Sequence, residues 1–428
     1  MPAVLDPPIR TAPSAAASWR VTTPLLLLLF IATAAYLHFY DQQHTPIHND
    51  LIGRQFATRA VLHGVSPYSP EMKRQIQAVA GHDPGQGFDY PILLAVLLAP
   101  LANLPWPILR LGFLVFVIPA LFASFLLCIR LAQWRVPRKQ AIAIALVCLC
   151  SWPVVLGLRM QQPTLLVAVL ALPACWLLSH DREVLPGILL ALSTFKPQVV
   201  LPLILWLLVW SALRRRWTFP LAFAVTELLF LLCGEWLLPG WFPQWLGTLH
   251  QYRALGNVAP LDLYVGRFVG NLATGVIVTG AMLRLWRLRR CAPESVEFAQ
   301  ATALLLAATL CVTPVIWAMI YNQVLLIPAC LLLLCSPRPN DARLGGALSG
   351  SAASNLSRAV IVWTFVSVPV AALGEWLCPS SVWMSMPFLG HMLAPCLVLA
   401  LLTTLSAPRP GQALLFSPGA SSVRRPPP

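Results

Sequence analysis

The sequence predicts an all-α, polytopic membrane protein, and two observations carry that prediction. Hydrophobic residues make up 58% of the 428-residue chain and charged residues only 10%, whereas a soluble protein carries about 25% charged residues. Apolar blocks long enough to cross a bilayer recur from Pro24 to about Ser406. A large soluble domain has no room between them.

The basic residues indicate how the chain is oriented in the membrane. A formal net charge of +14 invites a nucleic-acid interpretation. However, arginine and lysine gather in short gaps between apolar blocks, at 130–139, 214–216, 284–290, 338–343 and 424–425. Cytoplasmic loops of membrane proteins carry such an excess of basic residues. We therefore expect membrane lipids, and no nucleic acid, as partners.

The chain divides into three predicted parts. Residues 1–21 are rich in proline and alanine and predict a disordered cytoplasmic tail, while 407–428 predict a Pro-rich cytoplasmic tail. Between them, 22–406 form a single transmembrane domain. The first apolar block resembles a signal peptide with a cleavage site near Ala34, but it stays apolar to Tyr40, which favours an uncleaved span.

In chain order, the first span at 24–40 leads to an outer loop at 41–90. A short broken helix at 91–104 precedes a crossing at 107–129, because Leu104-Pro105-Trp106-Pro107 interrupts the apolar run. The segment Leu185–Leu213 has two cytoplasmic flanks and predicts a short hairpin with Lys196 at its outward tip. The other predicted spans lie at 140–157, 163–179, 218–237, 265–283, 299–319, 322–335, 356–376 and 388–405. This gives about twelve crossings, with the polar chemistry on the outer face.

Asp50 opens the longest polar interval between the first two apolar blocks. It has two interpretations that do not exclude each other: a helix N-cap, or the catalytic base of a membrane enzyme. Residues 51–63 predict an imperfect amphipathic helix, with Arg54, Gln55 and Arg59 on its polar side, suited to lying along the membrane surface. A helix N-terminus favours the carboxylate anion that a general base requires.

Lys196 is a lone cation in an otherwise uncharged hairpin. A lysine inside a membrane costs about 2.5–3.5 kcal/mol at a helix centre, so it must reach water, a carboxylate or a phosphate. One interpretation is an interfacial lysine that only reaches water. The other is a phosphate ligand at the outer leaflet, with Arg159, Arg253 and Arg267 as rival ligands. Glu227 falls in the middle of a span and is expected to pair with a neighbouring helix.

Several familiar motifs are absent from the sequence. It has no Walker motif, no GxGxxG, no HExxH and no GxSxG, and its eleven cysteines form no CxxC pair. We therefore expect no cofactor and no metal site. The simplest interpretation of the outer tryptophans, such as Trp236 and Trp245, is an aromatic belt. The more specific alternative is that their rings stack on sugars.

The sequence resembles the bacterial family-87 glycosyltransferases, which are polyprenyl-phosphate-mannose-dependent α-mannosyltransferases of the C-type glycosyltransferase fold. In that family, an acidic residue after the first span is followed by alanines, a glycine and a Pro-Tyr pair. The present sequence matches this pattern in register at Asp50, Ala57, Arg59, Ala60, Leu62, Gly64, Pro67 and Tyr68. Its Lys-Pro-Gln element is complete at Lys196, Pro197 and Gln198. Weaker likenesses are found at Phe88, Tyr90, Pro91, Gln162, Thr313, Pro314 and Tyr321, and the departures from the pattern are Arg54, Gln55, Ile92 and Asn322.

The resemblance implies an inverting hexosyl transfer, with mannose as the expected sugar. A polyprenyl-phosphate sugar is the donor, a lipid or glycan is the acceptor, and Asp50 is the general base. Lys196, Arg159 and Arg267 would bind the donor phosphate. Arg54, Arg59, Tyr68, Tyr90, Gln162, Gln198, Tyr321 and Asn322 would line the substrate pocket. The expected location is the bacterial cytoplasmic membrane, with the site on its extracytoplasmic side, in a protein that builds the cell envelope.

Two other functions stay open from the sequence. A transporter or flippase for lipid-linked saccharides would use the outer loop as a binding lid, and paired discontinuous helices in two similar halves would favour it. No such symmetry is visible in the sequence. A polymerase or ligase of lipid-linked glycans would use the same outer face with different chemistry.

Overall fold

The computed structural model describes residues 50–80, 87–134, 136–254, 261–313, 319–335 and 393–405. Every regular element in these ranges is a helix. The predicted spans at 24–40 and 356–376 and both predicted tails lie outside the described residues.

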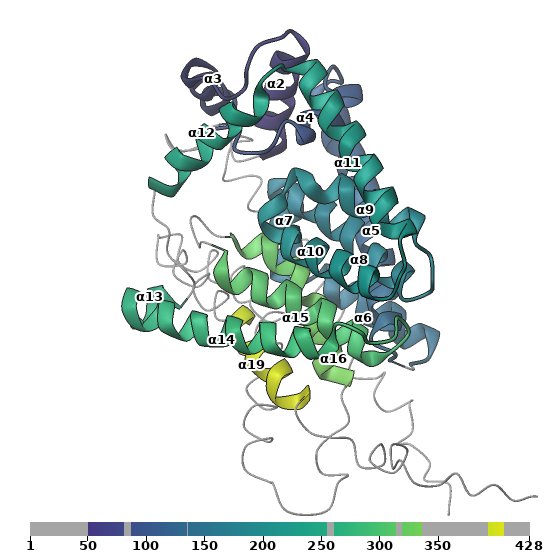
Figure 1. Ribbon diagram of the computed structural model, residues 1–428. Helices are drawn as coiled ribbons and strands as arrows, with labels where there is room; N and C mark the ends of the chain where they lie inside the picture. The colour runs from purple at the N-terminus through teal and green to yellow at the C-terminus, as the bar shows by residue number, and fades with distance from the viewer. Residues whose placement is uncertain are drawn as a thin grey trace, which may run out of the picture.

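The helices are stacked along one long direction (Figure 1). One end holds α2 (Asp50–Leu62), α3 (Pro70–Ala80), α4 (Leu93–Leu98) and α12 (Trp241–Ala254). The opposite end holds α14 (Arg267–Leu288), α16 (Ile327–Cys335) and α19 (Leu393–Leu405). The predicted outer loop at 41–90 and the outer segment after Trp236 therefore both carry helices, and these helices share one end of the molecule.

Among the described residues, three helices are long and apolar enough to cross a membrane, namely α5 (Trp106–Leu131), α11 (Thr218–Leu237) and α14. A bent pair formed by α6 (Arg138–Leu149) and α7 (Trp152–Met160) would be a fourth span. Shorter apolar helices accompany them: α8 (Pro163–Leu178), α9 (Val184–Leu192), α10 (Pro197–Leu213) and α15 (Val296–Val312). The protein is thus an all-helical, multi-pass membrane protein.

Prolines set most of the breaks in this pattern. The predicted broken helix at 91–104 is present as α4 and the 3₁₀ helix η1 (Ala99–Leu101), and α5 starts directly after Pro105. The span predicted at 140–157 corresponds to the bent pair α6 and α7, which meet at 57°, so this segment is a broken helix and not a continuous one. Pro153 lies in the first turn of α7, where its missing N–H costs nothing, so a new helix begins there instead of continuing α6.

The predicted spans at 299–319 and 322–335 are also corrected. α15 ends at Val312, and the next residue, Thr313, is extended (φ −68°, ψ 123°) because it precedes Pro314. The second segment begins as the 3₁₀ helix η3 (Met319–Leu326) and becomes α16 only at Ile327, one residue before Pro328. The first predicted span is therefore regular helix as far as Val312, and the second starts with a 3₁₀ segment before its regular helix.

The hairpin predicted at Leu185–Leu213 is confirmed. The chain runs through α9, the 3₁₀ helix η2 (Ser193–Phe195) and α10, with Lys196 at the break between the two arms. Its base is closed by Arg216, whose Nε donates to Glu183 Oε1 at 2.7 Å and whose Nη1 lies 3.1 Å from Asp181 Oδ1. Because these residues flank the two outer ends of the hairpin, the turn at Lys196 lies at the other end.

The hairpin packs against α11 at very close range. A Cβ atom on Gly187 of α9 would lie 2.8 Å from the backbone oxygen of Phe219 and 2.8 Å from the backbone nitrogen of Phe223. Farther along, Thr194 Oγ1 donates to the two carboxylate oxygens of Glu227, at 2.9 and 3.2 Å. The prediction that Glu227 pairs with a neighbouring helical segment is therefore correct, and its partner is in the Lys196 hairpin.

Gly187→Ala is expected to destabilise the protein by about 1–3 kcal/mol, the usual cost of inserting a methyl group where packing leaves no space. The backbone of α11 cannot move aside as a flexible side chain can. Thermal unfolding in detergent measures the effect. The matched control is Gly112→Ala in α5, because no atom lies within 4 Å of the place where a Cβ atom on Gly112 would lie. This variant should leave the melting temperature unchanged or slightly raised. Equal melting temperatures for the two variants would contradict the close α9–α11 contact.

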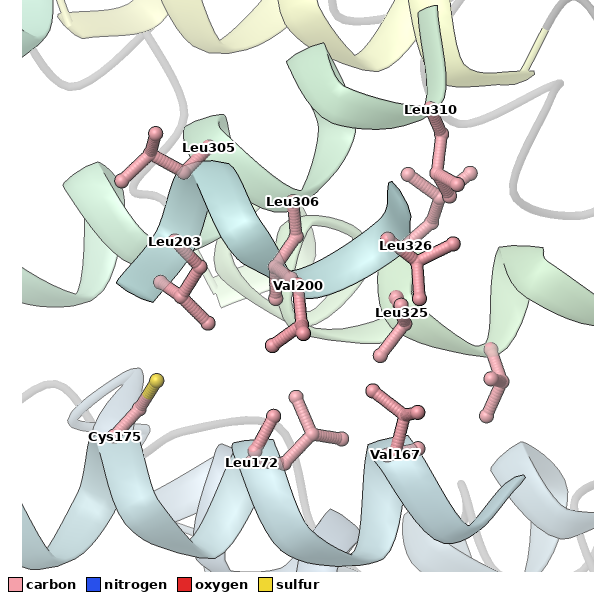
Figure 2. Packing of buried hydrophobic residues seen from close by; sticks show 14 of the residues in the cluster. Val167, Leu172, Cys175, Val200, Leu203, Leu305, Leu306, Leu310, Leu325 and Leu326 are labelled. Carbon is pink, nitrogen blue, oxygen red and sulfur yellow. The ribbon is translucent and has the colours of Figure 1, made fainter. Parts of the chain in front are cut away.

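A core of buried apolar side chains packs α8 against α10, α15 and η3. Figure 2 shows α8 on one side, with Val167, Leu172 and Cys175, facing residues of α10, α15 and η3 on the other: Val200, Leu203, Leu305, Leu306, Leu310, Leu325 and Leu326. All of these side chains are buried. The beginnings of α8 and α10 and the middle of η3 are consequently fixed relative to one another by apolar packing.

Candidate functional site

α2 confirms the helix predicted at 51–63, but its polar side does not face water. Its place along the membrane surface stays a prediction. In the structure Asp50, Arg54 and Gln55 are buried, while the apolar Leu62 is exposed. Polar side chains can be buried at acceptable cost when the protein supplies their partners. The next contacts show what those partners are.

Two of the polar side chains of α2 bind the backbone where α5 begins. Gln55 Nε2 donates to the carbonyl oxygens of Ala102 at 2.9 Å and Leu104 at 2.8 Å. Arg59 donates to the same two oxygens, through Nε at 2.6 Å and Nη2 at 3.1 Å. Pro105 follows Leu104 and has no N–H, so the helical hydrogen-bond ladder is interrupted here. Arg59, predicted as a pocket residue, thus ties α2 to this break.

Asp50 and Arg54 face a tyrosine at the centre of the site. Asp50 lies in the first turn of α2, and its Oδ1 is 4.0 Å from Nη1 of Arg54. The Arg54 guanidinium carbon lies 5.1 Å from the ring centroid of Tyr90 and its side chain hydrogen-bonds to Tyr90. Burial alone would lower the pKa of Arg54, but the charge of Asp50 and the contacts with Tyr90 raise it, so the guanidinium stays charged.

Lys196 is the centre of a second buried cluster. Its side chain is 2% exposed. Its Nζ donates to Thr164 Oγ1 and, at 3.1 Å, to Asn322 Oδ1, while Thr164 Oγ1 also donates to Asn322 Oδ1 at 2.6 Å. The ring of Tyr321 has its centroid 5.0 Å from Nζ. A lysine held in this way does not simply extend into water, so the interfacial alternative does not fit the structure.

The two clusters meet at Tyr90. Lys196 Nζ lies 5.8 Å from the same ring centroid that Arg54 approaches, and the charges of Asp50 and Arg54 both act on Lys196. Tyr68 holds Tyr90 in place, because its hydroxyl donates to the Tyr90 carbonyl oxygen at 3.0 Å. The site therefore joins α2, the segment before α4, the start of α8, the hairpin tip and η3.

The sequence interpretation missed two members of this site. Thr164 was not among the predicted site residues, although it contacts Lys196 directly. Asp89 was not among them either, yet its carboxyl group interacts electrostatically with that of Asp50, and burial raises the pKa of Asp89 while Arg54 and Lys73 lower it. Its position beside Tyr90 and Pro91 was the one signal in the sequence that could have indicated this.

The remaining predicted residues are less closely connected. Gln162 is fully buried two residues before Thr164, and Arg159 is half-buried in the last turn of α7. Arg267 begins α14 and is exposed, as is Gln198. Neither of these exposed residues is among the partners of Lys196 described above. Nor do any three His, Cys, Asp or Glu side chains among the described residues lie close enough to hold a metal ion.

With this geometry in place, comparison with known proteins decides the family. The model of glycosyltransferase family 87 matches residues 88–314, slightly more than half of the chain. The chain belongs to glycosyltransferase family 87. No curated protein and no solved structure matched it. As a family 87 member it is a membrane glycosyltransferase, an enzyme that uses a sugar donor and an acceptor.

The family 87 match divides the site into two groups of residues. Tyr90, Thr164 and Lys196 lie inside the matched range. Asp50 and Arg54 precede it, and Tyr321 and Asn322 follow it. The family 87 match does not cover the second group, so these residues are assigned to the site from their contacts alone.

Proposed function

We propose that the protein transfers a hexosyl group, with mannose as the expected sugar, from a polyprenyl-phosphate donor to a lipid or glycan acceptor. The observation that carries this proposal is the convergence of Asp50 with two buried cations, Arg54 and Lys196, around Tyr90. A carboxylate beside buried cations supplies both a proton acceptor and a place for a phosphate leaving group.

The proposed reaction is a single displacement. Asp50 accepts the proton of the acceptor hydroxyl as that oxygen attacks the anomeric carbon. The bond between the anomeric carbon and the phosphate oxygen breaks, and its electron pair leaves with the polyprenyl phosphate. Lys196 stabilises the charge on the departing phosphate. Attack opposite the leaving group inverts the anomeric centre, so a β-linked donor gives an α-linked product.

Transfer with purified components tests the proposal. The protein is incubated with radiolabelled polyprenyl-phosphate mannose and candidate lipid and glycan acceptors, and labelled products are separated from the donor. We expect a new labelled product and release of polyprenyl phosphate in equal amounts. Movement of intact donor between the two leaflets of a vesicle, with no glycosidic product, would instead support the transporter or flippase function.

The membrane arrangement is part of the same proposal. We expect about twelve crossings in a C-type glycosyltransferase-like fold, with both termini in the cytoplasm and the site on the extracytoplasmic face of a bacterial cytoplasmic membrane. The motivation is the clustering of arginines in a few short gaps between apolar blocks. On this arrangement the predicted lipid-linked donor would enter from the outer leaflet.

Reporter fusions give a direct prediction for this topology. A fusion at Gly81, which lies outside the described residues, should report the extracytoplasmic side. A fusion at Arg215, in the exposed turn between α10 and α11, should report the cytoplasm. Paired enzymatic reporters, each active on only one side of the membrane, provide the measurement. Two fusions on the same side would rule out the proposed orientation.

A further inference from the structure

Arg54 is a buried cation whose hydrogen-bonding groups are only partly used. Its side chain is 5% exposed, and within the described ranges its Nε and Nη1 have no hydrogen-bond partner. The nearest carboxylate oxygen of Asp50 is 4.0 Å from Nη1, which is an ion pair but not a hydrogen bond. Leaving buried, charged donors unsatisfied is costly, about 1–3 kcal/mol or more for each. A missing acceptor at this position is the simplest physical explanation.

The charges around Arg54 indicate that the missing acceptor is an anion. Arg54 and Lys196 lie at the centre of the site, and Lys73 acts on Asp89 from its edge. The opposing carboxyl groups are Asp50 and Asp89, and burial raises the pKa of Asp89, which disfavours its negative charge. Because Nε and Nη1 of Arg54 have no acceptor among the described residues, a bound anion would satisfy donors that these carboxyl groups leave unused.

The arrangement also favours a particular shape of anion. A guanidinium presents its N–H groups as a planar fork that matches two oxygens of a carboxylate or phosphate, whereas an ammonium acts as a point charge. Arg54 provides the fork and Lys196 the point charge, on a tyrosine ring that both cations contact. A tetrahedral phosphate has enough oxygens to accept hydrogen bonds from both cations at once.

We infer that Arg54 and Lys196 together bind the phosphate of the sugar donor, with Arg54 as the second phosphate ligand in place of Arg159 or Arg267. This inference rests on the proposed function and assigns a ligand that the family resemblance did not supply, because Arg54 is a departure from the family pattern. It also places the leaving phosphate next to Asp50, since one guanidinium contacts both groups.

Direct binding tests the inference without any transfer step. The probes are a short-chain polyprenyl monophosphate, the corresponding polyprenol, and inorganic phosphate, each titrated into purified protein. Arg54→Gln should weaken polyprenyl-phosphate binding by about tenfold or more, the usual cost of losing a hydrogen bond to a charged group. Polyprenol binding should not change. Arg215→Gln, in the exposed turn between α10 and α11, is the matched control and should bind like the wild type.

A double substitution sharpens the test. If Arg54 and Lys196 hold the same phosphate, Arg54→Gln combined with Lys196→Met should weaken binding by less than the product of the two single effects. Independent multiplication of the effects would overturn the shared site. Arg54→Lys checks against misfolding, because it keeps the positive charge and should bind with intermediate affinity. Inorganic phosphate that binds as tightly as the lipid would show that a free anion, and not a lipid headgroup, is the ligand.

Two further outcomes would overturn the inference, and both are distinct from failure of the proposed function. If Arg54→Gln binds polyprenyl phosphate as the wild type does but transfers sugar more slowly, Arg54 acts only on Asp50. If wild-type protein binds the phosphate no better than the polyprenol, no phosphate site is present. The proposed function itself fails only if the transfer assay gives no product from any polyprenyl-phosphate sugar.

Discussion

Asp50→Asn should lower turnover by about 10²–10⁴-fold, the usual contribution of a general base, while the protein folds normally. Asparagine keeps the shape of the side chain and loses only the small benefit of a negative charge in the first helical turn, so α2 should still begin at residue 50. It cannot accept a proton at neutral pH. The measurement is the initial rate of sugar transfer at saturating donor and acceptor, with thermal unfolding as the check on folding.

Two other carboxylates serve as comparisons for Asp50. Asp181→Asn removes a mostly exposed charge at the base of the hairpin, which pairs with Arg216, and should leave the transfer rate near that of the wild type. Asp89→Asn should retain much more activity than Asp50→Asn. Burial raises the pKa of Asp89, and asparagine resembles the neutral acid closely. Full activity of Asp50→Asn with a verified donor and acceptor would end the assignment of Asp50 as the base.

Lys196→Met should reduce kcat/KM for the donor by about 10²–10³-fold, the range seen when one group that stabilises developing negative charge is removed. Methionine fills a similar volume without the charge. The hydrogen bond of 2.6 Å from Thr164 to Asn322 does not need the lysine. Burying an ammonium group is itself costly, so removing its charge offsets the lost contacts and the protein level should stay close to that of the wild type.

The control for Lys196→Met is Lys139→Met, which removes an exposed lysine near the start of α6. It should not change kcat/KM. Equal donor use by Lys196→Met and the wild type would show that Lys196 only supports the structure around Thr164 and Asn322. Loss of folded protein in Lys196→Met, with normal specific activity in the folded fraction, would lead to the same conclusion.

Parts of the fold could be predicted where prolines, apolar runs or charged residues mark the ends of helices directly. Proline positions and apolar runs were enough to predict the break before α5 and the helix α11, and the charged flanks were enough to predict the Lys196 hairpin. The bend near Pro153 and the end of α15 before Pro314 were not predicted, because the average hydrophobicity of a segment does not report a break inside it.

The site could be predicted as a set of residues but not as a set of contacts. Asp50, Tyr90, Lys196, Tyr321 and Asn322 were all anticipated, and the structure joins them. The burial of α2 was not anticipated. Its polar side chains bind carbonyl groups near Pro105, and no pattern within α2 reveals partners more than 40 residues away.

The hydrogen bond between Lys196 and Asn322 has a consequence for how the protein is made. These partners are 126 residues apart in the chain, and a ribosome that adds about 5–20 residues per second needs several seconds or more to span that distance. During this interval the hairpin leaves the ribosome with its lysine unpaired by Asn322. We expect the nascent hairpin to stay near the translocon or an insertase until η3 emerges, so stalled chains that end before Asn322 should remain associated with that machinery.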